Sequence, residues 1–133
     1  MDKKNNKEAI ARANNASIST KQSIAICKFL KGKSIDQAVK ELTEVIKMKR
    51  AIPMHGEIPH RKGGFPGRYP VKAADLFIKL LKNLEANANI KGLDITKTKI
   101  SAKADKASRP RKPGRLSGRR FKRTHITLIL KKP

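Results

Sequence analysis

The chain has 133 residues, which fits one domain, and a formal net charge of +23, from 33 lysines and arginines against 10 acidic residues. Self-repulsion on this scale disfavours a compact state, so a polyanionic partner is expected, with nucleic acid first and an anionic membrane surface second. A single cysteine excludes an internal disulfide and a cysteine zinc cluster, and the scarcity of aromatic residues excludes base stacking as the main binding mode. No stretch reaches the ~20 apolar residues of a membrane span, which indicates a soluble protein of a reducing compartment.

The first part of the chain predicts one short strand followed by two helices. A weak alternation of apolar and polar residues predicts a strand near Glu8–Ala13. The first helix is expected over Thr20–Lys31, with Gly32 as a left-handed residue that ends it. The second is expected over Ile35–Met48, where apolar residues recur on one face of a 3.6-residue helix.

The starts of both helices carry the same sequence pattern. Ser19 with Gln22, and Ser34 with Gln37, are S-x-x-Q pairs, which predict a reciprocal capping box at each helix start. The polar face of the second helix is charge-balanced, with Asp36, Glu41 and Glu44 among Lys40 and Lys47.

A long basic loop and a third helix follow. Residues 49–69 contain four glycines and three prolines, which predict an extended loop. Loops of this length are usually functional or disordered. The third helix is expected to open with Pro70 at its first position and to run to about Ala88, before Gly92. Its apolar stripe is expected to form the centre of the core, through Val71, Ala74, Phe77, Ile78, Leu81 and Leu84, widened by Leu76 and Leu80.

The last part of the chain predicts two strands around a basic tip. Apolar residues alternate with polar ones around Ile100 and again from Ile126, and Pro110 and Pro113 should open the pairing between them. The predicted fold is therefore α+β, with three helices packed on a small three-stranded antiparallel sheet and a long protruding β-hairpin. We expect a single domain over residues 1–133. Its body is expected at about 8–98 with the return strand 124–131, and the hairpin extension at about 99–123.

Arginine is concentrated at the predicted tip. Six of the ten arginines lie between residues 109 and 123, where only two of the 23 lysines lie. The planar guanidinium binds phosphate through two hydrogen bonds and stacks on bases, so this clustering favours close contact with a structured polyphosphate. A merely disordered basic tail would not explain the apolar alternation that resumes at Ile126. RNA is favoured over DNA, because helix-turn-helix, zinc-finger and basic-zipper patterns are absent.

No catalytic constellation can be assembled from the sequence. His55 and His60 share a loop without nearby cysteines or paired carboxylates, so a metal site is not expected. Cys27 lies among apolar residues of a helix and is expected to be a buried small side chain rather than a nucleophile. The "GGFPG" stretch at 63–67 lacks the lysine and the following Ser or Thr of a phosphate-binding loop.

Several motifs resemble a known family. The run "GRYPVKAA" at 67–74 and "EANA" at 85–88 are specific rather than compositional. The earlier "ISTKQSIAICKFLKGKSIDQAVKEL" and the final "THITLIL" are similar to the same family's first two helices and return strand. The chain resembles the universal large-subunit ribosomal protein family numbered twenty-two in the bacterial naming, in its archaeal and eukaryotic branch, from about Glu8 to Leu130.

The resemblance implies a non-enzymatic structural constituent of the large ribosomal subunit in the cytoplasm. It implies binding to large-subunit ribosomal RNA, support of its assembly, contacts with neighbouring ribosomal proteins, and a hairpin that lines the exit tunnel beside the nascent peptide. No cofactor, metal, membrane or small-molecule substrate is expected. The rival interpretations are a DNA-compacting chromatin-type protein, a membrane-surface protein and a nuclease. The residues expected to bind RNA are Arg50, His60, Arg61, Lys62, Arg68, Tyr69, Lys72, Lys103, Arg109, Arg111, Lys112, Arg115, Arg119, Arg120, Lys122 and Arg123.

Overall fold

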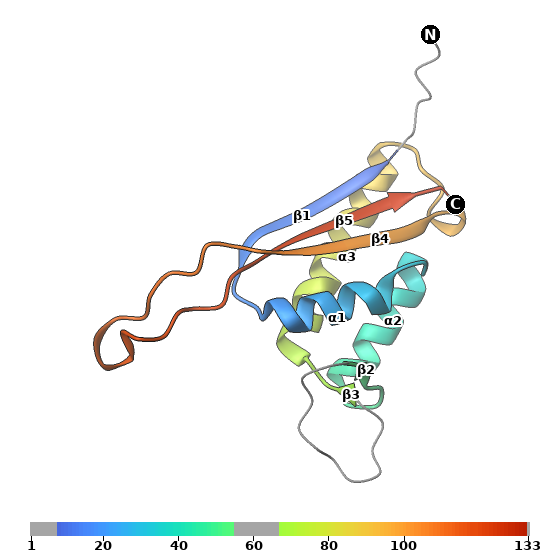
Figure 1. Cartoon of the computed structure of the whole chain (residues 1–133). Helices are drawn as coiled ribbons and strands as arrows, with labels where there is room; N and C mark the ends of the chain where they lie inside the picture. The colour runs from blue at the N-terminus through green and yellow to red at the C-terminus, as the bar shows by residue number, and fades with distance from the viewer. Residues whose placement is uncertain (1–7, 55–66, 133) are drawn as a thin grey trace.

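The structure, a computed structural model, describes residues 8–54 and 67–132 (Figure 1). The described part contains three helices and one three-stranded antiparallel sheet, which confirms the predicted α+β class. Its elements, in chain order, are β1 (Ala9–Ala16), α1 (Thr20–Leu30), α2 (Ile35–Ile46), β2 (Ile52–Pro53), β3 (Gly67–Arg68), α3 (Val71–Ile90), the 3-10 turn η1 (Ile95–Lys97), β4 (Lys99–Lys106), the 3-10 turn η2 (Gly114–Leu116) and β5 (Thr124–Lys131).

The sheet is built around the last strand of the chain. The strand order is β1-β5-β4, so β5 pairs with both neighbours, and Leu128 lies opposite Ala11 on one side and Ala102 on the other. Alternate residues of β5 face opposite sides of the sheet. Ile126, Leu128 and Leu130 are fully buried on the side covered by α1 and α3, as the alternation predicts.

The core lies between this side of the sheet and the helices. Phe77, Leu81 and Leu84 on α3 are fully buried, as expected for the central stripe. The stripe is shifted slightly from the predicted one: Val71 and Ile78 are only partly buried. Alanines complete the buried face instead, including Ala73 and Ala88.

The predicted capping boxes are wrong in their reciprocal form. The Ser19 side chain makes no capping hydrogen bond, and the Ser23 hydroxyl donates to the Ser19 carbonyl instead, at 2.7 Å. Ser34 does cap α2, since its oxygen accepts from the Gln37 amide at 3.4 Å. The Gln37 side chain donates to Glu41 at 3.2 Å rather than returning to the helix start.

The predicted helix boundaries are confirmed at two glycines and differ from the structure at other positions, including the end of α3, which runs to Ile90 rather than to about Ala88. Gly32 and Gly92 have φ of +81° and +70°, as expected for left-handed residues after helices. Helix α2 ends at Ile46 rather than Met48, because Met48 itself adopts a left-handed φ of 57°. Pro70 caps α3 rather than opening it.

The predicted loop at 49–69 contains a short ladder that the sequence did not indicate. Strands β2 and β3 pair antiparallel, with Ile52 opposite Arg68 and Pro53 opposite Gly67. Ile52 is fully buried and packs in the core, which anchors this end of the loop. His55, His60, Arg61 and Lys62 lie outside the described residues.

Residues 107–123, hereafter the arginine segment, project from one end of the sheet between β4 and β5 (Figure 1). The regular ladder ends at the pair Lys106–Thr124, before the prolines. Pairing does not open fully between them, however, because Arg111 and Arg120 form an isolated bridge. The Lys112 amide also donates to the Arg119 carbonyl at 3.0 Å.

Candidate nucleic-acid interface

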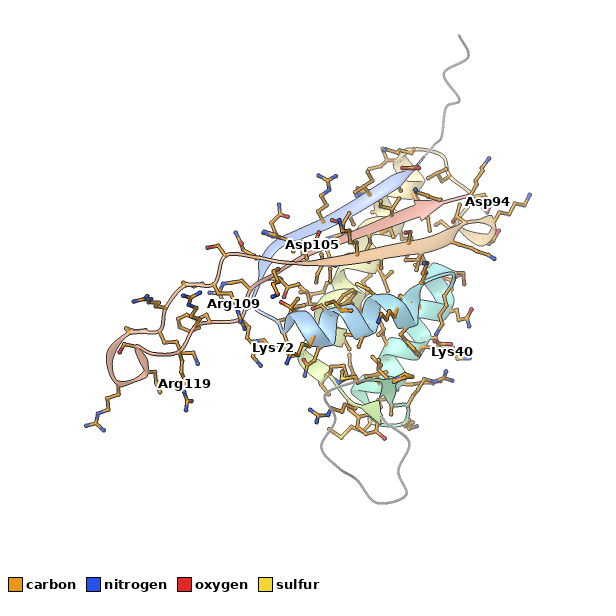
Figure 2. The ribbon with its side chains drawn as sticks, viewed as in Figure 1. Lys40, Lys72, Asp94, Asp105, Arg109 and Arg119 are labelled. Carbon is orange, nitrogen blue, oxygen red and sulfur yellow. The ribbon has the colours of Figure 1, made fainter. Side chains whose placement is uncertain are left out.

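The arginine segment concentrates positive charge outside the body. It contains eight basic residues and no acidic one. Six of the eight are exposed, and Lys112 and Arg123 are partly exposed. Figure 2 shows Arg109 and Arg119 on the projecting segment, at the end of the molecule opposite Lys40 and Asp94. The eight basic residues are Arg109, Arg111, Lys112, Arg115, Arg119, Arg120, Lys122 and Arg123.

The body neutralises part of its own charge, whereas the segment does not. Carboxylates that pair with basic residues lie on α2, α3 and β4, beside η1 and just before β1. For example, Asp75 pairs with Lys79 at 3.3 Å, and Glu8 pairs with Lys131 at 3.5 Å. Among the described residues, no ion pair joins a carboxylate to the arginine segment. A dense, carboxylate-free group of guanidinium ions is therefore available to an external polyanion.

A second basic group lies where β3 meets α3. Arg68 is partly exposed on β3, Tyr69 is 42% exposed, and Lys72 is exposed in the first turn of α3. The three predicted residues are brought together because they follow one another around the tight Pro70 entry to the helix. In the sequence they follow residues 55–66, which include the predicted residues His60, Arg61 and Lys62 and lie outside the described part of the chain.

Arg50 and Lys103, two more of the predicted residues, already have acidic partners within the chain. The Arg50 Nε donates to Glu44 at 2.9 Å, and its Nη1 lies 3.5 Å from Glu41. Lys103 on β4 lies 3.5 Å from Asp105, with its side chain 73% exposed. A role for either residue in RNA contact stays a prediction, and RNA would have to compete with these carboxylates.

Glu41 is the buried member of this acidic group, although the sequence pattern places it on the polar face of α2. It is 8% exposed. Burial raises the pKa of its carboxyl, but hydrogen bonds from Lys33 and Gln37 and the charges of Lys33 and Arg50 outweigh this, so the pKa is lowered overall. The Lys33 ammonium also lies 3.5 Å from the centre of the Phe29 ring. Glu41 thus ties the α1–α2 connection to the start of the basic loop.

The open side of the sheet contains a basic residue that sequence reasoning missed. Arg12 on β1 lies opposite Thr127, which in turn lies opposite Lys103, so the three form one row across the sheet. The row faces away from the helices, and Arg12 is exposed. The alanines on either side of Arg12 were the available signal, but their alternation was too weak to predict which face of the sheet Arg12 occupies.

A shallow hollow at the end of the sheet away from the arginine segment is also basic. Lys97, Lys99 and Lys132 contribute to it beside the start of α2. Hydrogen bonds from Thr96 and the charges of Lys97 and Lys132 lower the pKa of the neighbouring Asp94. None of these lysines was among the predicted RNA-binding residues, because single lysines spread along the sequence do not reveal that they converge in space.

Other kinds of site find little support in the part of the chain that the structure describes. Residues 8–54 and 67–132 contain no group of three or more His, Cys, Asp and Glu side chains placed to hold a metal ion. Within the same ranges, no helix combines the length and apolar character needed to cross a membrane. Cys27 is 6% exposed, as predicted, and burial, with a smaller effect of the Asp105 charge, raises the pKa of its thiol to about 12.

Comparison with known proteins decides the family. Residues 11–131 match the family described as ribosomal protein L22p/L17e. The chain belongs to this family. The large ribosomal subunit protein uL22 of Ignicoccus hospitalis is 39% identical, over 97% of this chain and 91% of the relative. The corresponding proteins of Archaeoglobus fulgidus and Methanocaldococcus jannaschii are 41% and 38% identical, over 84% and 93% of this chain and 80% and 87% of the relatives.

Family membership confirms the resemblance found in the sequence motifs. The L22p/L17e family is a family of ribosomal proteins with a structural role in the large subunit. The match begins within β1 and ends at the last residue of β5, so it includes most of β1, the other two strands of the sheet, the three helices of the described part and the arginine segment.

Proposed function

We propose that this chain is a constituent of the large ribosomal subunit that binds large-subunit ribosomal RNA through its arginine segment and lines the nascent-peptide exit tunnel with the tip. The proposal rests on family membership and on one structural observation. That observation is the projecting segment with eight basic residues and without a carboxylate partner among the described residues. The chain would act in the cytoplasm, as part of the ribosome, with ribosomal RNA and neighbouring ribosomal proteins as partners.

The segment has the reach and the chemistry to enter folded RNA. Each of its two arms contains about eight residues, which in extended form span roughly 25 Å at ~3.3 Å per residue. Guanidinium groups along both arms can each hold a phosphate through two hydrogen bonds. Arg109 lies near the sheet and Arg119 near the tip, so phosphates at several depths could be held at once (Figure 2).

The body would bind RNA at its surface through the remaining predicted residues. Arg68, Tyr69 and Lys72 would form one contact region, to which the predicted residues His60, Arg61 and Lys62 are expected to add further contacts. Phosphate contacts of this kind fix position and orientation without reading sequence. The arginine segment would then thread inward while the body remains outside, with its apolar core intact.

Co-sedimentation tests the assignment to the ribosome. We expect the tagged full-length chain to sediment with large subunits in a lysate gradient and to remain there after a moderate salt wash. Recovery at the top of the gradient, or with chromosomal DNA, would contradict the assignment and favour the DNA-compacting alternative. A photo-crosslinking amino acid at Arg115, compared with one at Ile90, tests the tunnel. Only the former should crosslink to a stalled nascent chain.

A further inference from the structure

Phe121 is the only aromatic residue of the arginine segment, and it is 38% exposed. We propose that its ring is a stacking site for one unpaired nucleobase of the RNA partner. The inference rests on the RNA-binding function proposed above, to which it adds one base contact among the phosphate contacts. A single ring of this kind is compatible with phosphate contacts remaining the main mode of binding.

The exposure of Phe121 is not explained by packing. Phe77 is fully buried, and Phe29 packs against the core, whereas Phe121 does not belong to the core cluster or to the residues that pack on it. The exposed part of such a ring gains nothing from the hydrophobic effect. Exposed aromatic residues within a charged, projecting surface are typical of binding sites, where the ring becomes buried by the partner.

The backbone holds the Phe121 ring at a defined place. The Phe121 amide donates to the Pro110 carbonyl at 2.9 Å, next to the bridge between Arg111 and Arg120. The ring is therefore presented where the two arms of the segment are joined, and not on an unpaired stretch. A pre-positioned ring loses little conformational freedom when a ligand binds it.

Two cations flank the ring. The Lys112 ammonium and the Arg123 guanidinium carbon each lie 5.4 Å from the centre of the Phe121 ring, within the range of a cation–π contact. Both belong to long side chains that can swing aside. A nucleotide carries a flat base and a phosphate. Its base could stack on the ring, while its phosphate forms ion pairs with the displaced Lys112 and Arg123 side chains. Paired bases are already stacked in a helix, which is why we specify an unpaired one.

The chain contains no tryptophan, which makes a direct optical test possible. In Phe121→Trp, the single indole would report stacking through quenching of its fluorescence. The full-length variant is titrated with single-stranded oligoadenylate and with inorganic polyphosphate of matched charge. Ile90→Trp is the control, since Ile90 is 84% exposed at the end of α3. The neighbouring Lys91 donates to the Glu8 carbonyl, so this control lies beside the start of β1, at the far end of the sheet from the segment.

We expect oligoadenylate to quench Phe121→Trp and polyphosphate not to, with neither affecting Ile90→Trp. Phe121→Leu keeps an apolar side chain without a π face, so it should weaken oligoadenylate binding at least about fivefold. Its affinity for polyphosphate should not change. Circular dichroism and thermal unfolding of this variant should match those of the wild type, because the ring lies outside the core.

Equal quenching by both ligands, or unchanged oligoadenylate affinity in Phe121→Leu, would overturn the stacking site. The ring would then only support the stems of Lys112 and Arg123. Wild-type binding to a large-subunit RNA fragment is measured in parallel. If that binding persists, the proposed function stands without the stacking site. If it is absent, the proposed function fails, and the stacking inference fails with it.

Discussion

The Thr124 hydroxyl donates a hydrogen bond of 2.9 Å to the carbonyl oxygen of Ile18, at the point where the arginine segment joins the body. The Thr20 hydroxyl lies 3.0 Å from the Thr124 oxygen and is left to donate to it. Thr124 is fully buried. This pair of hydrogen bonds ties the start of β5 to the connection between β1 and α1, and so fixes the direction in which the segment leaves the sheet.

Thr124→Val should destabilise the protein by about 1–3 kcal/mol, because it leaves the buried Ile18 carbonyl without its donor while keeping the side-chain shape. Urea unfolding would measure the free energy of unfolding, with the denaturant slope unchanged. Thr127→Val is the matched control on the same strand, since Thr127 faces the open side of the sheet and is partly exposed. Its effect should stay within about 0.5 kcal/mol. Equal losses at the two sites would mean that the Thr124 hydrogen bonds contribute nothing.

Local periodicity was enough to predict most of the fold. The 3.6-residue repeat of α2 and α3 and the alternation of β5 are properties of neighbouring residues, so they could be read directly from the sequence. The Ile52–Arg68 pairing could not be predicted in this way, because it joins residues on either side of a Gly- and Pro-rich stretch. The ion pair of Glu41 was also missed, because its partner Lys33 precedes α2 and is not part of the helical repeat.

The candidate site likewise contains residues that the sequence could predict and residues that it could not. The arginine cluster was visible because its members lie close together in the sequence, and the structure describes them on one projecting segment. Arg12 could not be found, since its place in the row with Lys103 arises from the pairing of three strands. The ordering of the segment by the Phe121–Pro110 hydrogen bond was also missed, because prolines normally interrupt pairing.

Leu81→Ala should cost about 2–5 kcal/mol in stability, because Leu81 is fully buried in the middle of α3 and its truncation leaves a cavity. Lys79→Ala on the same helix should change stability by no more than about 0.5 kcal/mol. The Lys79 ammonium forms only an exposed ion pair with Asp75, at 3.3 Å. Thermal and urea unfolding of both variants would check this. A comparable loss in Lys79→Ala would contradict the assignment of the buried face.

Stability should fall at alkaline pH through Cys27. Its thiol ionises near 9.0 in the unfolded chain, whereas burial raises the pKa in the folded protein to about 12. Below pH 9 the thiol is protonated in both states, so it has no effect on stability. Between about pH 9 and 12 only the unfolded chain loses the proton, and the free energy of unfolding decreases by up to ~1.4 kcal/mol per pH unit.

Cys27→Ala separates this effect from the titration of the lysines. We expect the wild type to lose stability more steeply than the variant between pH 9 and 11, in parallel urea titrations. The native thiol should also resist alkylation at pH 8.5 until denaturant is added. Parallel pH profiles for the two proteins would show that Cys27 does not titrate differently in the folded state.

Glu41→Gln should destabilise the protein by about 1–3 kcal/mol at neutral pH, because it removes the charge that Lys33 and Arg50 face. The lowered pKa of Glu41 means that its contribution is present above the ordinary carboxyl value of 4.5. That contribution is lost as pH falls through the folded pKa. The difference between wild type and variant should therefore shrink towards acid pH. Glu44→Gln, at a more exposed position, should cost about 0–1 kcal/mol.

The arginine segment should depend on the guanidinium group and not on charge alone. The double change Arg115→Lys and Arg119→Lys keeps the net charge but loses the two-pronged contact with phosphate. Each hydrogen bond lost to a charged group is worth about 1.5–3 kcal/mol, so binding to a large-subunit RNA fragment should weaken tenfold or more. Lys79→Ala, which removes a charge from the surface of α3, should bind nearly as well as the wild type.

The salt dependence of binding separates geometry from charge. Wild-type affinity should fall steeply with salt, with a log–log slope of roughly 0.7–0.9 per neutralised phosphate. The double lysine variant should have nearly the same slope as the wild type, because it releases the same number of counterions. Its affinity should be lower at every salt concentration, because its contacts with phosphate are weaker. Random duplex DNA of equal length is the second ligand. The difference in affinity between the wild type and the variant should be smaller for this DNA than for the RNA. If the variant binds RNA as tightly as the wild type, the segment contributes only charge, and its proposed threading through RNA loses its physical basis.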